Sequence, residues 1–257
     1  MPPFGVGEDS GMNSRGRLVW LAAVAVIALT AAACSSRRGD THGATSEVSS
    51  SPATPLSSPV ASSDLVARFG YKSAWLAFRG LTQQQVATAL GLSGVKAQDW
   101  QTAIHATYVD NPAVAVTPPF HGAGGNWTLA TSVALMLAEP DVAALSKKTG
   151  TEVQYFVTER ISDTHGWAKA VDGRLIRLFQ WGGDMGEILK WVGRPDRIEQ
   201  GFGLPDVARA TQATSDALFD ANIDEETVMT LAGHWSVSPE AIEGTPSHGD
   251  PLVGTMP

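Results

Sequence analysis

Cysteine is almost absent from this chain, which has one among 257 residues, Cys34. Without a second cysteine the protein cannot form an internal disulfide, so a folded domain must be held together by its core. Basic clusters are missing too: 18 Lys and Arg residues stand against 26 Asp and Glu, a formal net charge of −8. Nucleic acids and anionic surfaces attract Lys/Arg clusters, so the composition argues against nucleic acid as a partner.

The sequence also lacks the common catalytic signatures. It has no G-x-S-x-G elbow, no H-E-x-x-H, no Walker loop and no paired-cysteine motif. Gly122–Gly125 ("GAGG") lacks the third glycine and the strand-to-helix setting of a dinucleotide site, which predicts a turn between strands. His105, His121 and Glu159 do not have the spacing that is diagnostic of a metal site. We therefore predict no cofactor and no bound metal.

A single long apolar run is present, from Leu18 to Ala33, and it ends at Cys34. This run is shorter than the roughly 20 residues that a bilayer-spanning helix needs. Arg15 and Arg17 precede it, and small residues close it, which is the pattern of a secretory signal peptide. We therefore expect residues 1–33 to be a signal peptide.

The residues "TAAAC", 30–34, resemble the lipobox of bacterial lipoproteins, in which the cysteine receives a diacylglyceryl group and becomes the mature N-terminus. The resemblance implies that Cys34 carries acyl chains such as palmitate and that the protein lies on the outer face of the cell membrane. Ala31 stands where leucine is commoner. Ala31-x-Ala33 also suits ordinary signal peptidase, which would release a secreted protein instead.

Serine, threonine and proline dominate the segment that follows Cys34. Such a segment cannot bury enough apolar surface to offset the ordering of its backbone, so we expect 34–64 to be a disordered linker. We expect a globular domain over 65–240 and a disordered tail over 241–257.

Hydrophobic periodicity in 65–240 predicts an α+β fold, mainly an antiparallel sheet of hairpins with about three helices on it. Thr82 and Gln85 have the spacing of a capping box, and Asp224 is a suitable N-cap. The patterns indicate strands at 71–78, 102–109, 113–120, 127–135, 152–161 and 186–193, and helices at 80–92, 139–150 and 224–239.

Asp172-Gly173 predicts a tight hairpin turn between "GWAKAV" and "RLIRLFQW", because both central residues of the favoured turn need positive φ. Counting outward from the turn pairs Val171 with Arg174, Lys169 with Ile176 and Trp167 with Leu178. It also places Ala168 and Ala170 on the opposite face, near Leu175 and Arg177, where small side chains would let a helix approach closely.

Asp163 and His165 precede this hairpin. Residues i and i+2 of a strand share a face, so Asp163 can orient His165 as a general base requires. Ser162 is adjacent to Asp163, and its side chain therefore points the other way. Two interpretations stay open: a histidine that is structural or recognises a ligand, and an acid/base pair in a cell-envelope hydrolase.

Seven of the eight tryptophans lie in the expected domain. They fill the core, or some of them form a platform on which a sugar stacks. For the platform we expect Trp167 and Trp181 to be the exposed pair, with Arg174 or Lys169 beside them.

Residues 152–189 and 225–239 are similar to an uncharacterised bacterial domain family. The similarity rests on a strand ending near a histidine, the Trp167-Ala168 hairpin, and a terminal helix closing in W-S-x-x-P at 235–239. It implies a single domain and no particular activity. We expect a membrane-anchored extracytoplasmic binding or envelope-interaction module. Its expected partners are the membrane, through Cys34, and a cell-wall glycan or an envelope protein.

Overall fold

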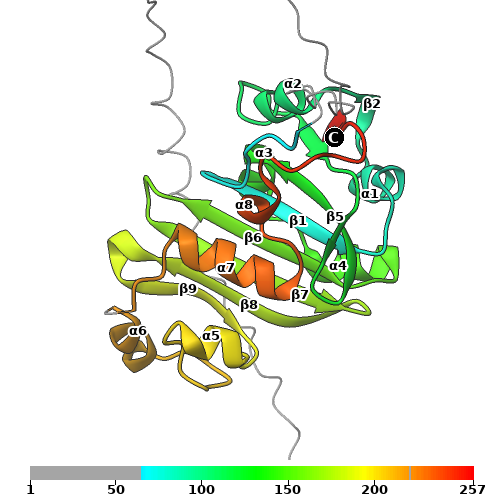
Figure 1. The fold of residues 1–257 in the computed structure, drawn as a ribbon. Helices are drawn as coiled ribbons and strands as arrows, with labels where there is room; N and C mark the ends of the chain where they lie inside the picture. Colours follow the sequence, from blue (N-terminus) through cyan, green and yellow to red (C-terminus); the bar gives the residue numbers. More distant parts are fainter. Residues whose placement is uncertain (1–64, 220) are drawn as a thin grey trace, which may run out of the picture. The chain divides into compact units, whose positions relative to one another are not determined.

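The computed structural model describes residues 65–219 and 221–257. The expected signal peptide (1–33) and linker (34–64), including Cys34, lie outside these residues. The described chain forms one ten-stranded sheet in the order β2-β10-β3-β5-β1-β6-β7-β8-β9, with β4 paired to β5 (Figure 1). All the paired strands are antiparallel. The expected α+β fold, mainly an antiparallel sheet, is confirmed.

The strands, in chain order, are β1 (Ser73–Arg79), β2 (Ser93–Ala97), β3 (Val114–Val116), β4 (Phe120–Gly122), β5 (Gly125–Ser132), β6 (Val153–Glu159), β7 (Thr164–Val171), β8 (Arg174–Gly182), β9 (Glu187–Val192) and β10 (Leu252–Thr255). The helices are α1 (Gln83–Leu90), α2 (Trp100–His105), α3 (Val133–Ala138), α4 (Val142–Thr149), α5 (Arg197–Gly201), α6 (Gln212–Leu218), α7 (Glu225–Trp235) and α8 (Pro239–Ile242). The described residues thus contain more helices than the three expected, because several are only one or two turns long.

Helix caps that the sequence predicts are present. Thr82 and Gln85 form the capping box of α1, and the backbone N–H of Thr227 donates to the side chain of Asp224 at the start of α7 (2.9 Å). Two further caps bound α4: the side chain of Asp141 accepts the backbone N–H of Ala144 (2.9 Å), and Gly150 ends the helix in the left-handed conformation. Each cap satisfies a helix N–H or C=O that would otherwise lack a partner, which fixes where these helices begin and end.

One face of the sheet carries a line of rings from five neighbouring strands, which we call the aromatic row: Trp75, Phe156, Trp167, Phe179 and Trp191. Ring centroids are 5.2 Å apart for Trp75 and Phe156, and 4.6 Å apart for Trp167 and Phe179. α7 lies across this face (Figure 1) and adds Trp235, 6.1 Å from Phe156. Aromatic pairs contribute roughly 0.5–1.5 kcal/mol beyond the area they bury, so the row is the centre of the main core.

The opposite face of the sheet carries smaller side chains. Ala168 and Ala170 are buried there, and α4 crosses β6, β7 and β8. Tyr155, on the same face, donates a hydrogen bond to the carbonyl of Leu135 in α3 (3.4 Å). The expected close approach of a helix over these alanines is confirmed.

The hairpin β7–β8 forms as expected at Asp172-Gly173, whose φ angles are 51° and 75°. Val171 pairs with Arg174, but a bulge between Lys169 and Ala170 shifts the register by one residue. Two expected pairs are therefore wrong: Lys169 faces Arg177 instead of Ile176, and Trp167 faces Phe179 instead of Leu178. Because a slip of one residue exchanges the faces of a strand, Arg177 lies on the face of the aromatic row and not with the alanines.

The strand expected at 102–109 is wrong. Asp99 caps a helix there by accepting a hydrogen bond from the backbone N–H of Thr102 (3.0 Å). Trp100, Ala103 and Ile104 are the buried residues of this helix, α2, and their i, i+3, i+4 spacing is helical. The strand expected at 127–135 also ends early, at Ser132, whose side chain caps α3.

The C-terminal segment is not the expected disordered tail. Pro239 begins α8 instead of ending α7, and residues 252–255 form β10 in the interior of the sheet, between β2 and β3. Val253 and Gly254 are buried in this strand. Four residues are too few to give a readable periodic pattern, so the strand is set by its partners.

We expect removal of residues 251–257 to lower the free energy of unfolding by at least about 3 kcal/mol, because the buried Val253 and the ladder hydrogen bonds on both sides of β10 are lost. Urea unfolding followed by tryptophan fluorescence measures this change. A chain that lacks only Met256 and Pro257, which follow β10, is the control and should match the full chain. Equal stability of the two truncated chains would show that β10 does not hold the sheet together.

Candidate functional site

Asp163 and His165 do meet. Asp163 lies just before β7 with a φ of 43°, and its Oδ1 is 3.0 Å from Nε2 of His165. Its carboxylate lies over Gly183, where an added Cβ would come within 1.7 Å of Oδ2. Only glycine fits at position 183 with Asp163 in this place. The imidazole itself is buried, with 2% of its surface exposed.

The second ring nitrogen of His165 is also occupied. Nδ1 is 2.9 Å from Oγ1 of Thr158, which lies directly opposite on β6. When Nε2 carries the proton and donates to Asp163, Nδ1 accepts the hydroxyl hydrogen of Thr158. Oγ1 of Thr158 is also 3.4 Å from Oε1 of Glu225, the first residue of α7, and its one hydrogen can donate to only one of these two acceptors at a time. We call Asp163, His165, Thr158 and Glu225 the His165 network.

The His165 network ties the start of α7 to the sheet. Arg160, just past β6, donates to Oε2 of Glu225 at 2.6 Å. The backbone N–H of Lys72, just before β1, donates to Oε1 at 3.3 Å. Glu225 also lies in the first turn of a helix, where a negative charge is favoured by the helix dipole. Together with Arg160 and Lys72, the network therefore connects the ends of three strands to the start of α7.

Carboxylate, imidazole and hydroxyl follow one another in the order of a catalytic triad, with Thr158 in the place of the nucleophile. The hydroxyl, however, is at the enclosed end: Thr158 is fully buried, whereas 48% of the Asp163 side chain is exposed. A nucleophile must reach a substrate carbonyl, which this hydroxyl does not do in the structure. Ser162, as expected, faces away from His165 and donates to Thr164 (3.0 Å).

Trp167 and Trp181 are not an exposed pair, so that expectation is wrong. Trp167 belongs to the aromatic row and Trp181 is cross-strand neighbour to His165, and they are 1% and 4% exposed. Trp75, Trp100, Trp127 and Trp235 are buried as well, and Trp191 is partly buried. The tryptophans of the domain are core residues.

The five residues expected to form a site are not gathered in one place. Asp163, His165 and Trp181 lie at one end of β7 and β8, and Trp167 lies in the aromatic row. Arg174 is exposed beside the turn at the other end of the hairpin. A ligand that touched Asp163 would therefore not reach Arg174.

A buried carboxylate that the sequence analysis missed lies beside the aromatic row. Oε1 of Glu199, in α5, accepts hydrogen bonds from Nε1 of Trp167 and Nε of Arg177, both at 2.7 Å. Oε2 accepts the backbone N–H of Asp196 (2.9 Å). Burial lowers the pKa of Arg177, and the charge of Glu199 opposes that shift. Asp196 and Glu199 have the spacing of a capping box. That spacing predicts where α5 begins, but it does not predict that the Glu199 carboxylate is buried.

Asp196 extends this cluster to α7. Its Oδ2 accepts the indole N–H of Trp235 at 2.7 Å. The ammonium of Lys169 lies 3.7 Å from the centre of the Trp235 ring, and burial lowers the pKa of Lys169. Glu199 and Arg177 are buried, Lys169 is partly buried and Asp196 is exposed; together these groups hold α5 and α7 to one another and to β7 and β8.

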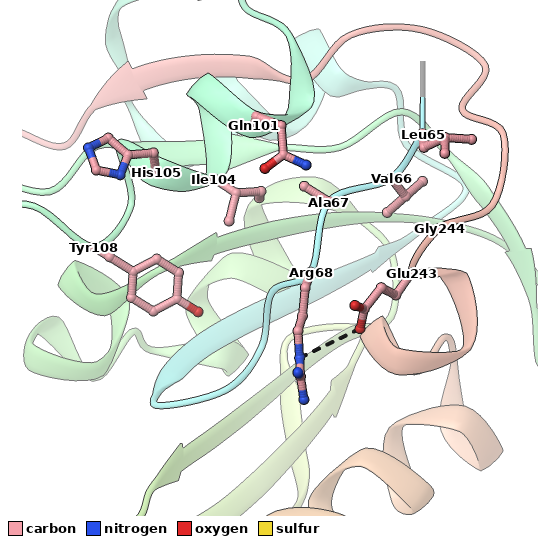
Figure 2. Close-up of a pocket in the computed structure, with 10 residues that line it drawn as sticks. All are labelled: Leu65, Val66, Ala67, Arg68, Gln101, Ile104, His105, Tyr108, Glu243 and Gly244. Carbon is pink, nitrogen blue, oxygen red and sulfur yellow. Dashed lines mark ion pairs between the residues drawn. The ribbon is translucent and has the colours of Figure 1, made fainter. Parts of the chain in front are cut away.

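A concave site lies elsewhere, beside α2. The α2 groove, about 560 Å³ in volume, is lined by the extended segment 65–68, by Gln101, Ile104 and His105 of α2, by Tyr108, and by the turn 243–244 (Figure 2). Sequence reasoning missed it because its walls come from two misread segments: 102–109 is a helix instead of a strand, and 243–244 belongs to the ordered C-terminal part. His105, considered above as a metal ligand, lies on its rim.

Within the described residues, no group of three or more His, Cys, Asp or Glu side chains could hold a metal ion. Over the same residues, no helix is both long enough and apolar enough to cross a membrane. Comparisons of the chain with protein-family models, with curated proteins and with solved structures gave no match.

We expect Thr158→Val to lower the free energy of unfolding by about 1–3 kcal/mol, because Nδ1 of the buried His165 loses its hydrogen-bond donor. Asp163→Asn should lower the free energy of unfolding by a smaller amount. The carboxamide oxygen can still accept a hydrogen bond from Nε2 of His165, and the side chain is half-exposed. Urea unfolding of the full chain measures both. Ser162→Ala is the control and should change stability by less than about 0.5 kcal/mol. If Thr158→Val behaved like this control, the His165 network would not be holding the fold.

Proposed function

We propose that this chain is a lipid-anchored extracytoplasmic protein whose folded domain binds a component of the cell envelope and catalyses no reaction on it. A diacylglyceryl group on Cys34 holds the protein to the outer face of the cell membrane, and 34–64 spaces the domain from that surface. The apolar run ending at a lone cysteine supports the anchor. Two acyl chains are needed for stable attachment, since a single chain binds reversibly.

The observation that carries the non-catalytic assignment is the enclosure of the His165 network. Both ring nitrogens of His165 are occupied by protein groups, and the hydroxyl that would act as nucleophile is fully buried. Thr158, His165 and Glu225 make contacts that join a strand to a strand or to α7, and Asp163 holds the imidazole of His165. Such a network stabilises the fold without needing a substrate.

Binding is supported by the α2 groove. Its volume lies within the roughly 300–1,000 Å³ of small-molecule sites, and it combines apolar walls with a few polar side chains. A tethered protein does not need tight binding, because the anchor keeps its local concentration near the envelope high. Resemblance to the uncharacterised bacterial domain family is compatible with this role and adds no activity to it.

A hydrolase is the second candidate, favoured by the order of Asp163, His165 and Thr158. It would require a motion that exposes the Thr158 hydroxyl to a substrate. In that case Thr158→Val and Asp163→Asn would abolish turnover in a broad panel of ester, amide and glycoside substrates while the fold stayed intact. Under the proposed function the wild-type chain shows no turnover in this panel, and Thr158→Val changes only stability.

Cys34→Ala is expected to move the protein from the membrane to the medium, because no acyl chains can then be attached. Partition of cell protein between detergent and aqueous phases, together with assay of the protein in the medium, measures this shift. Ala31→Leu, which supplies the residue commoner in a lipobox, is the matched control and should leave the protein in the detergent phase.

Two outcomes would contradict the anchor. Cys34→Ala protein that stayed in the membrane would indicate an uncleaved signal segment. Wild-type protein found in the medium would indicate cleavage after Ala33 by ordinary signal peptidase and a secreted protein.

A further inference from the structure

We propose that the α2 groove is a binding site for a neutral oligosaccharide. This inference extends the proposed function. It rests on that function only for the source of the ligand, which is a glycan of the cell envelope. The inference depends on four properties of the groove. It has an apolar floor and a fixed aromatic ring, its rim carries both hydrogen-bond donors and hydrogen-bond acceptors, and the positive and negative side chains on the rim are paired with each other.

The floor of the groove is apolar and the backbone beneath it is fixed. Val66, Ala67 and Ile104 contribute buried side chains. The extended segment is held by a pair of backbone hydrogen bonds, from Val66 N to Thr245 O (3.0 Å) and from Gly244 N to Val66 O (2.9 Å). A groove that is already formed costs a ligand little ordering free energy.

Tyr108 supplies an aromatic ring that is 39% exposed. Its hydroxyl donates to the carbonyl of Tyr71 at 2.8 Å, so the ring is held in one orientation. Partial burial raises the pKa of Tyr108, which keeps the hydroxyl protonated and able to donate. The C–H face of a pyranose or furanose ring is apolar, and it can stack on a tyrosine ring without loss of side-chain entropy.

Polar side chains surround this ring on two sides. Figure 2 shows Gln101 and His105 along the α2 side, and Arg68 and Glu243 on the opposite side. Arg68 can only donate hydrogen bonds, ionised Glu243 can only accept them, and the Gln101 amide does both. Sugar hydroxyls both donate and accept, so each of these groups has a partner on such a ligand.

The charge of the groove favours a neutral ligand. Arg68 and Glu243 form an ion pair, with Nε and Oε2 3.6 Å apart. An anionic ligand would have to compete with Glu243 for the guanidinium, and a cationic ligand would have to compete with Arg68 for the carboxylate. A ligand rich in hydroxyl groups bonds to both members without separating them.

The test measures binding of trisaccharides to the purified full chain by titration calorimetry. The neutral probes are chitotriose, mannotriose and maltotriose, trigalacturonate is the anionic probe, and cosedimentation with purified cell walls covers other envelope glycans. We expect wall binding, and a dissociation constant between about 1 μM and 1 mM for at least one neutral probe. Trigalacturonate should bind at least tenfold more weakly than that probe.

Tyr108→Ala should weaken binding at least tenfold, whereas Tyr108→Phe keeps the ring and should retain binding if its thermal unfolding shows that the fold is intact. Gln101→Ala should weaken it several-fold. Phe219→Ser changes an exposed ring outside the groove, 72% exposed, and is the matched control that should bind as the wild type does.

Three results would overturn the proposal. The first is that neither the neutral probes nor the cell walls bind, and the second is that Tyr108→Ala leaves binding unchanged. The third is that the anionic probe binds more tightly than every neutral probe. These results leave the anchor untouched, because membrane partition of Cys34→Ala is measured without any glycan. Conversely, a secreted protein could still bind a neutral trisaccharide in the α2 groove.

Discussion

The arrangement of helices on the main core depends on one buried carboxylate. Glu199 is fully enclosed, and its Oε1 binds Arg177 and Trp167 at 2.7 Å each. Taking a carboxylate and a guanidinium out of water costs several kcal/mol per ion, which is offset only when the charges are well placed and their hydrogen bonds are made. The bulge in the β7–β8 hairpin puts Arg177 on the required face. Through Asp196, the same helix also holds Trp235 at the end of α7.

Asp163 and His165, which suggest catalysis in the sequence, make contacts within the fold, and the groove proposed as a ligand site lies elsewhere. The His165 network joins β6 and β7 to the start of α7, just as Asp196 joins α5 to its end, so α7 is held at both termini. The α2 groove is built on other elements, between α2 and the turn at 243–244.

How much the sequence predicts depends on whether an element is specified locally. The Asp172-Gly173 turn and the capping box of α1 are fixed by neighbouring residues, and both were predicted. β10 is four residues long and depends on β2 and β3, which are distant in the sequence, so no local pattern reveals it. The bulge at Lys169 is set by packing across the sheet, and it alone determines which face Arg177 occupies. The contact between Asp163 and His165 was predicted from their spacing. The enclosure of Thr158 depends on α7, which is distant in the sequence, and could not be predicted in this way.

A double-mutant cycle on Arg177→Met and Glu199→Leu tests most directly whether buried polar contacts hold this domain together. Each single substitution leaves one buried charge without its partner, and should lower the free energy of unfolding by about 3–5 kcal/mol. The double substitution removes both charges, so it should lower the free energy of unfolding by clearly less than the sum of the two single effects. The coupling energy between the two substitutions should be at least about 1.5 kcal/mol. Additive effects within about 0.5 kcal/mol would show that the two side chains act independently, and would contradict the account.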